Sequence, residues 1–322
     1  MTDRSVIVAE GSQLVKIMRR VAVGVLVGAL ALLGVPTSPD PASAAPSHSY
    51  IGGLAAALAR PNSSPPGAND WRCRPDAGHP EPVVLLHGLS NDTVTWDTMA
   101  PVLAAAGYCV FSTTYGRDWL GPVGAVTTVQ ESARQIAAFI DRVRLATGAR
   151  QVDLVGHSMG GAIPFYYLNH LGGVPRVNDY VALGAPLHGS DVSGVQTALA
   201  AALEIPDVGP RLARQCGGPC QLTPGSGFLR TLNPDPRIAP DIDFTMIVTR
   251  YDEVATPYRT GMLRGRNVRN VVLQDVCPTD FTEHYEMTAD PVAVRIVLEA
   301  LGARTADRGC TTVLPFLGPL PR

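Results

Sequence analysis

Residues 152–171 contain a strand, a glycine-bounded turn and a helix in direct succession. Residues 152–155 have the pattern of a buried strand, and residues 159–171 have the pattern of a helix. The turn between them reads Gly-His-Ser-Met-Gly-Gly, with no room for a longer connection. A strand that passes directly into a helix is the repeating unit of a parallel sheet, so this segment restricts the chain to an α/β architecture.

The rest of the chain repeats this alternation. Further strands are expected at 82–87, 108–112, 180–183, 244–248 and 271–273, and further helices at 96–106, 126–147 and 292–301. Because the strands are continuous apolar runs, both faces of the sheet must be covered by helices. Residues 186–240 show no strand pattern and are too long for a simple connection. We expect a lid-like insertion there, over the carboxyl edge of a mostly parallel sheet.

The N-terminal segment 1–44 has the features of a secretory signal peptide. Lys16, Arg19 and Arg20 precede a run at 21–35 in which every residue is apolar or glycine. That run is shorter than the roughly 20 residues of a membrane span, although an uncleaved anchor remains the alternative. Small residues at 42–44 predict cleavage after Ala44 and export from the cell. A start at Met18 would give a more compact leader. Residues 45–79 are expected to form an N-terminal arm, and 80–322 the catalytic domain.

Composition excludes several classes of protein. Hydrophobic residues make up 46% and charged residues 17% of the chain, which is not the composition of a disordered protein. The formal net charge of −2 argues against a nucleic-acid binder. Because the only lysine is Lys16, the body of the chain contains neither a phosphate-binding loop lysine nor a Schiff-base lysine. We expect no metal or organic cofactor.

Six cysteines follow the leader, an even number that predicts disulfides in an exported chain. The spacing of Cys216 and Cys220 also suits metal ligation, but no second close Cys or His pair accompanies it. Connectivity does not follow from spacing alone. We predict Cys73–Cys109 to tie the arm to the sheet, Cys216–Cys220 as a local loop, and Cys277–Cys310 to brace the loop before the last helix.

Ser158 stands between a strand and a helix in the pattern Gly-x-Ser-x-Gly. This sharp turn exposes the serine hydroxyl at the N-terminus of the helix, where developing negative charge is stabilised. Small residues at Gly156 and Gly160 are needed because the turn leaves no space for side chains. The pattern therefore predicts that Ser158 is a nucleophile. Ser226, which also lies between glycines, is expected to be a turn residue.

A nucleophilic serine needs a base and a carboxylate that orients the base. His284 follows the last expected strand and precedes the final helix, and we predict that it is the base. His188 is its competitor. Asp252 follows the strand at 244–248 and is the predicted acid, with its neighbour Glu253 as the rival.

An oxyanion hole requires two backbone N–H groups directed at the developing charge. Met159, which follows the nucleophile, is expected to supply one of them. The loop after the first core strand begins His87-Gly88-Leu89, and Gly88 allows the backbone to turn there. Leu89 is therefore the second expected donor, and His87 is expected to shape the loop rather than to transfer protons.

Four segments together resemble the secreted bacterial class 2 lipases, which are triacylglycerol lipases and esterases of the α/β-hydrolase fold. These segments are His87-Gly88, the turn at 156–161, Leu-Gly-Ala-Pro-Leu-His-Gly-Ser at 183–190 and Tyr-Asp-Glu-Val at 251–254. The resemblance implies the same roles for Ser158, Asp252, His284, Leu89 and Met159. Residues 225–229 also look like a segment of this family. The long stretch at 186–240 departs from small relatives that lack a lid.

The resemblance implies a secreted, monomeric serine hydrolase that acts on lipid or other ester substrates and touches a lipid interface transiently. Two alternatives remain at this point. The same acyl-enzyme could be passed to an alcohol or sugar, which would make the protein an acyltransferase. A non-catalytic binding protein could also use this fold, since fold alone does not establish function.

Overall fold

The computed structural model describes residues 49, 59–118, 121–191, 216–232, 234–305 and 309–320. The expected signal peptide and most of the N-terminal arm lie outside these ranges, so both stay predictions. No helix among the described residues is long and apolar enough to cross a membrane.

Six parallel strands form the central sheet in the order β2-β1-β3-β4-β5-β6. The strands are β1 (Val83–Leu86), β2 (Val110–Ser112), β3 (Val152–His157), β4 (Val177–Leu183), β5 (Asp243–Val248) and β6 (Val268–Val272). The chain builds one edge first and then reverses direction across the sheet after β2. Ligands of such sheets bind beyond the carboxyl ends of the strands, next to this reversal. The α/β-hydrolase fold predicted from the sequence is confirmed.

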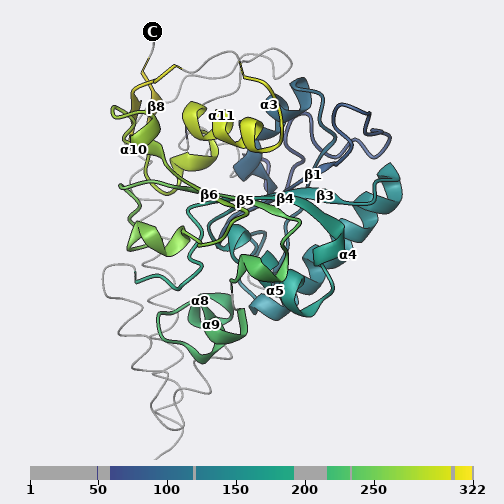
Figure 1. Ribbon diagram of the computed structural model, residues 1–322, viewed down its shortest axis with the longest axis horizontal. Helices are drawn as coiled ribbons and strands as arrows, with labels where there is room; N and C mark the ends of the chain where they lie inside the picture. The colour runs from purple at the N-terminus through teal and green to yellow at the C-terminus, as the bar shows by residue number, and fades with distance from the viewer. Residues whose placement is uncertain are drawn as a thin grey trace, which may run out of the picture. The chain divides into compact units, whose positions relative to one another are not determined.

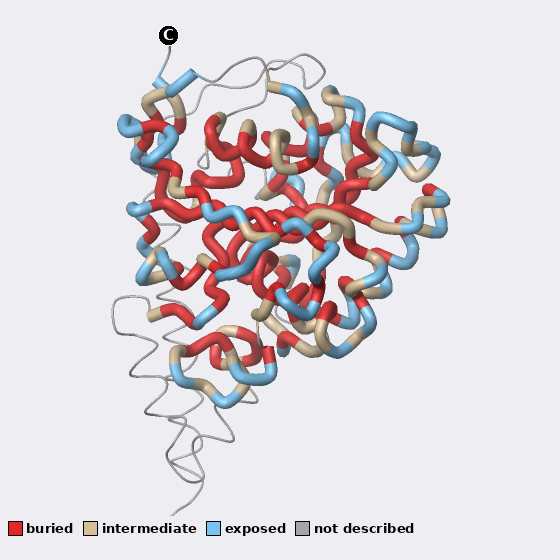
Figure 2. Tube along the Cα trace, in the orientation of Figure 1, coloured by how far each residue is buried: buried red, intermediate tan, exposed pale blue. Residues whose placement is uncertain are grey.

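Helices cover both faces of the sheet, as the apolar strands require (Figure 1). The helices α3 (Met99–Ala105) and α11 (Pro291–Ala300) lie on one face, and α4 (Val129–Thr147) and α5 (Pro164–His170) lie on the other. Successive side chains of a strand point to opposite faces. Accordingly Val84 and Leu86 pack with α4 and α5, whereas Val83 and Leu85 pack with α3 and α11. Figure 2 shows the strands as a buried layer between exposed helix surfaces.

Helix boundaries differ from those expected because local hydrogen bonds decide where each helix begins. The helix expected at 126–147 begins at Val129, since Gly116 O holds the backbone N–H groups of residues 126 and 127 and Thr128 caps the helix. The segment at 159–171 first forms a 3-10 turn, η2 (Ser158–Gly161), and α5 begins only at Pro164. The helix expected at 96–106 begins only at Met99, and Trp96 instead ends the 3-10 turn η1 (Thr93–Trp96).

The ends of two strands differ from those expected from the sequence. β4 begins three residues earlier than expected, at Val177, and β6 ends at Val272 because Leu273 starts the short helix α10 (Leu273–Val276). The small antiparallel pair of β7 (Val313–Leu314) and β8 (Gly318–Pro319) was not anticipated, since two-residue strands leave no periodic signal.

The expected insertion at 186–240 is described in part. It contains the short helices α8 (Gly218–Gln221) and α9 (Gly227–Leu232) and the 3-10 turn η5 (Pro236–Ile238). Its described residues include no strand, whereas 192–215 and 233 lie outside the described ranges. Ser226 is a turn residue: its hydroxyl donates to Gln221 O at 2.5 Å and accepts from Leu229 N.

Three disulfides join the six cysteines in the pairs predicted from the sequence, Cys73–Cys109, Cys216–Cys220 and Cys277–Cys310. No cysteine is free. Metal ligation by Cys216 and Cys220 is therefore wrong for this structure, because both sulfurs are bonded to each other. The third disulfide links the end of α10 to the segment that leads into β7.

Candidate active site

Ser158 occupies a sharp turn at the carboxyl end of β3. Its φ is +54°, in the left-handed region that residues other than glycine rarely adopt. A Cβ atom at Gly156 would lie 2.1 Å from Gly160 O, and one at Gly160 would lie 2.1 Å from Leu86 O. Both positions therefore require glycine, and the turn they permit holds the serine above the sheet edge.

His284 and Asp252 form a buried pair at the same edge of the sheet. The Nδ1 atom of His284 lies 3.0 Å from the Asp252 carboxylate. Backbone N–H groups of Val254 and Ala255 donate to Asp252 Oδ1 at 3.0 and 2.6 Å, which fixes the orientation of the carboxylate. Because a carboxylate only accepts hydrogen bonds, His284 Nδ1 carries a proton and donates it to Asp252.

Glycines also allow the parts of the site to approach closely. A Cβ atom at Gly184 would lie 3.1 Å from both His284 Nδ1 and Asp252 Oδ2. A Cβ atom at Gly88 would lie 2.9 Å from the Cβ atom of Ser158. The loop after β1, the serine turn and the His284–Asp252 pair therefore meet at one place, as the sequence pattern requires.

His157 contacts His284, a role that the sequence analysis missed. Its Nε2 atom lies 2.8 Å from His284 O, and the two ring centres are 4.7 Å apart. Burial, together with the neighbouring His284, lowers the pKa of His157 to about 3, so the ring is neutral. Since a carbonyl only accepts, Nε2 carries the proton of this ring and donates it. The histidine before the serine thus holds the backbone of the expected base.

Glu253 and Glu283 add two further supports to the same loop. Glu253 Oε2 accepts from His284 N at 3.2 Å, so Asp252 and its neighbour contact the ring and the backbone of one histidine. Glu283 accepts from the backbone N–H groups of Tyr285 and Phe316 at 2.5 and 3.1 Å. Burial raises the pKa of Glu283 to about 7. No periodicity marks these carboxylates, because they act on backbone groups of an irregular loop.

The loop after β1 is held by a buried His87 ring. His87 Nδ1 donates to Gly88 O at 2.8 Å, and its Nε2 accepts from Tyr115 N at 3.3 Å. The ring stacks on Tyr115 with the centres 4.4 Å apart. Burial lowers the pKa of His87 to about 4, so it is a neutral structural residue. This position agrees with the expectation that His87 shapes the loop.

A cavity of about 60 Å³ opens at Ser158, and most of its lining is apolar. Its lining comprises Leu89, Ser158, Met159, Pro186, Ser190, Pro219, Leu222, Val254 and Ala255. Leu89 and Met159, the two expected oxyanion donors, both line this cavity together with Ser158. Four of the lining residues, Pro186, Ser190, Pro219 and Leu222, come from the expected insertion at 186–240.

Of the two competing residues, Glu253 contacts the backbone of His284, whereas His188 lies away from the Ser158 cavity. His188 is exposed, and its Nε2 atom is 3.2 Å from Met262 O rather than at the Ser158 cavity. Among the residues that the structure describes, no group of His, Cys, Asp and Glu side chains could hold a metal ion.

Comparison with solved structures shows the same fold in lipolytic enzymes. Lipase B of Aspergillus fumigatus superposes with a TM-score of 0.54 at 19% identity, and the alignment covers 85% of this chain and 65% of that lipase. The mature lipase of Bacillus licheniformis gives 0.53 at 17% identity over 71% of this chain and 94% of the other. A study of two metagenome-derived lipolytic enzymes supplies a third match, at 0.50 and 17% identity, over 74% of this chain and 99% of that one.

A family model described as lipase (class 2) matches residues 80–297. This range contains every strand of the central sheet, the serine turn and the His284–Asp252 pair. The match covers more than half of the chain, so the protein belongs to the class 2 lipases, a family of carboxylic ester hydrolases.

Proposed function

We propose that the protein is a secreted lipase that hydrolyses acylglycerol esters through an acyl-enzyme on Ser158. The observation that carries this proposal is the meeting of a serine turn with a buried histidine–carboxylate pair at one sheet edge. A purely binding protein has no need of a histidine whose Nδ1 is committed to a carboxylate.

Each residue has one task in the proposed reaction. Ser158 Oγ attacks the ester carbonyl carbon while its proton passes to His284 Nε2. The N–H groups of Leu89 and Met159 stabilise the oxyanion. His284 then gives the proton to the leaving alcohol as the carbon–oxygen bond breaks. Water attacks the acyl-enzyme by the same route and releases the carboxylic acid and free Ser158.

Asp252 keeps His284 in the tautomer that this reaction needs and stabilises the imidazolium that forms transiently. Both side chains are buried, so water does not screen this interaction. No metal ion or organic cofactor takes part in the proposed steps.

Export is part of the proposal. The leader pattern at 1–44 and three disulfides both suit an oxidising environment outside the cytoplasm. We propose that the enzyme acts there as a monomer and contacts the lipid–water interface only transiently.

The deciding experiment compares the protein with its Ser158→Ala variant. The substrates are p-nitrophenyl esters from acetate to palmitate, together with emulsified triglyceride. We expect Ser158→Ala to lower kcat by about a thousandfold or more, because triad members act as a unit. A phosphonate ester inhibitor should add its mass to Ser158 alone.

Ser226→Ala is the matched control, since Ser226 also lies between glycines. It should leave kcat unchanged. Undiminished turnover by a folded Ser158→Ala protein would contradict the assignment. Ester transfer to added glycerol in preference to water would instead identify an acyltransferase.

A further inference from the structure

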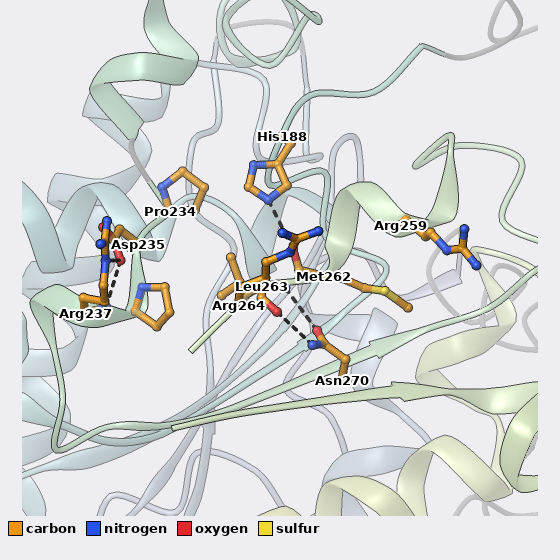
Figure 3. Close-up of a pocket in the computed structure, with 10 residues that line it drawn as sticks. His188, Pro234, Asp235, Arg237, Arg259, Met262, Leu263, Arg264 and Asn270 are labelled. Atoms are coloured by element: carbon orange, nitrogen blue, oxygen red, sulfur yellow. Dashed lines mark hydrogen bonds and ion pairs between the residues drawn. The ribbon is translucent and has the colours of Figure 1, made fainter. Parts of the chain in front are cut away.

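A second and much larger cavity is lined by residues that are close in the chain to those of the Ser158 cavity. Its volume is about 740 Å³, and three arginines, Arg237, Arg259 and Arg264, contribute to its lining. We call it the basic cleft (Figure 3). In that view the Asp235–Arg237 pair stands on one side and Arg259 on the other, with Arg264 between them. Nothing in the proposed ester hydrolysis uses these side chains.

Among the described residues, only one of the three arginines has an acidic partner. Arg237 is matched by Asp235, with Nη2 and Oδ2 2.6 Å apart, and the hydrogen bonds from Arg237 lower the pKa of that carboxyl. Neither Arg259 nor Arg264 has a carboxylate within 4 Å in the part of the chain that the structure describes. The guanidinium of Arg259 lies 5.3 Å from the Tyr258 ring centre, a contact that does not consume its N–H donors. Within the described residues, the cleft therefore carries positive charge on Arg259 and Arg264 that no carboxylate pairs.

The floor of the cleft is apolar. Leu263 and Pro236 are buried there, and Met262 is half-buried. The side-chain amide of Asn270 clamps the backbone N–H and carbonyl of Leu263 at 3.0 and 2.8 Å, which fixes this part of the floor. An apolar floor beneath unmatched guanidinium groups suits a molecule with a hydrocarbon part and one anionic group.

The same two chain segments line both cavities. Residues 186–190 contribute Pro186 and Ser190 to the Ser158 cavity and His188 to the basic cleft. Residues 254–264 likewise line both. Thr260 joins the segments, because its hydroxyl accepts from His188 N at 3.2 Å and donates to Gly189 O. The walls of the two cavities are therefore built from the same two, hydrogen-bonded segments.

We propose that the basic cleft binds an anionic amphiphile, with its carboxylate or phosphate on Arg259 and Arg264 and its hydrocarbon part on the apolar floor. Ester hydrolysis releases such a carboxylate, and this source of the ligand rests on the proposed function. A phospholipid head group has the same chemistry. The binding itself does not require turnover.

The test measures binding to the Ser158→Ala protein, in which no substrate is consumed. Decanoate, decyl phosphate and decanol serve as probes below their micelle concentrations, with affinity measured by calorimetry. Both anions should bind at least about tenfold more tightly than decanol, the difference expected of a charge-assisted hydrogen-bonded pair. Added salt should lower the affinity for the two anions and leave the affinity for decanol unchanged.

The informative variant is Arg259→Gln/Arg264→Gln. It should weaken decanoate and decyl phosphate by about tenfold or more without affecting decanol. Arg266→Gln is the matched control, since Arg266 is exposed on the same segment but does not line the cleft. It should leave all three affinities unchanged. Thermal unfolding confirms that each variant is folded.

Three results would overturn the proposal: equal binding of decanol and decanoate, undiminished anion binding by the double variant, or an equal loss from Arg266→Gln. The relative affinity of decanoate and decyl phosphate distinguishes a fatty acid from a phosphate head group as the source. Because binding is measured without Ser158, its outcome is independent of the ester assay. A failed hydrolysis assay would leave this binding result intact, and the reverse also holds.

Discussion

At the scale of single residues, His284 is held by more groups than a catalytic triad includes. Asp252 contacts its ring, Glu253 accepts from its backbone N–H, and His157 donates to its backbone carbonyl. These three contacts come from two different strand ends, β3 and β5. They fix both the ring and the backbone of the proposed base, which reduces the reorganisation needed during proton transfer.

The two neighbouring carboxylates should differ sharply in effect. Asp252→Asn should lower kcat by about a thousandfold or more, because an amide in this place favours the wrong tautomer of His284. Glu253→Gln keeps an oxygen that can accept a hydrogen bond from His284 N, so this change should lower kcat by no more than about threefold. Steady-state kinetics on a soluble p-nitrophenyl ester decides this. Comparable losses from the two changes would mean that the acid has been assigned incorrectly.

His157 should act through His284 rather than on substrate. His157→Phe removes the donor to His284 O and should lower kcat by about tenfold, with KM unchanged, the cost of one lost hydrogen bond. His157→Gln retains an N–H donor and should recover part of the rate.

The matched control is His170→Phe, because the exposed His170 bonds the carbonyl of Thr231 at 2.8 Å away from the site. It should leave kcat unchanged. If His157→Phe and His157→Gln lower kcat to the same extent and also lower the melting temperature to the same extent, then His157 has only a structural role.

At the scale of elements, the third disulfide braces the loop that carries His284. Cys277 is buried at the end of α10, and its bond to Cys310 closes a loop with a sequence separation of 33. The chain-entropy relation gives such a bond about 3–4 kcal/mol of unfolding free energy.

We therefore expect Cys277→Ser/Cys310→Ser to lower the melting temperature by about 10 °C and to reduce activity at temperatures where the protein remains folded. Cys73→Ser/Cys109→Ser is the matched control, because a separation of 36 gives about the same 3–4 kcal/mol as the third disulfide, and neither cysteine lines the Ser158 cavity. Thermal unfolding and ester hydrolysis are measured on the same samples. Full activity of the first variant would show that the His284 loop is held without the disulfide.

The elements also show how far sequence reasoning reaches. The apolar strands and the glycines of the serine turn could be predicted, because burial on two faces and a sterically closed turn restrict residue type directly. The starts of the helices could not be predicted. α4 begins at Val129 because a loop carbonyl binds the preceding N–H groups, and α5 begins at Pro164, a proline in the first turn of the helix. The supports at His157 and Glu283 could not be predicted either, because they bond backbone groups that only the folded loop brings near.

At the scale of the whole molecule, buried acidic groups lie at both ends of the parallel strands. The carboxyl edge carries Ser158 and the His284–Asp252 pair. Acidic groups lie together at the amino ends of the strands. Asp153 is the second residue of β3 and lies close to Asp179 and Glu81. Asp153 accepts from Asn178 Nδ2 and Asp179 N at 3.0 and 3.1 Å. Burial, with help from the neighbouring carboxyl groups, raises the pKa of Asp153 to about 8.

This shift makes stability depend on pH in a defined direction. Between about pH 4 and pH 8 the folded protein holds a proton on Asp153 that the unfolded chain has released. The free energy of unfolding therefore falls as pH rises through this window. Asp153→Asn removes the titration but keeps an oxygen acceptor, so it should raise the melting temperature at pH 8 and have little effect near pH 4.

Asp241→Asn, which changes an exposed carboxylate, is the matched control and should alter neither value. Thermal unfolding followed across pH 4 to 9 gives the comparison. If Asp153→Asn were destabilising at pH 8, the carboxyl would be ionised and stabilising in the folded protein.

The segment around β7 and β8 holds the loop at 281–284 through two hydrogen bonds. Val313 O accepts from Phe281 N at 3.0 Å, and Phe316 N donates to Glu283 at 3.1 Å, so residues far along the chain complete the loop that holds His284. Every strand of the central sheet precedes them. Because a chain is synthesised from its N-terminus, residues 313–316 are added after every strand of the central sheet. The two hydrogen bonds that hold Phe281 and Glu283 can therefore form only after the strands of the sheet have been made.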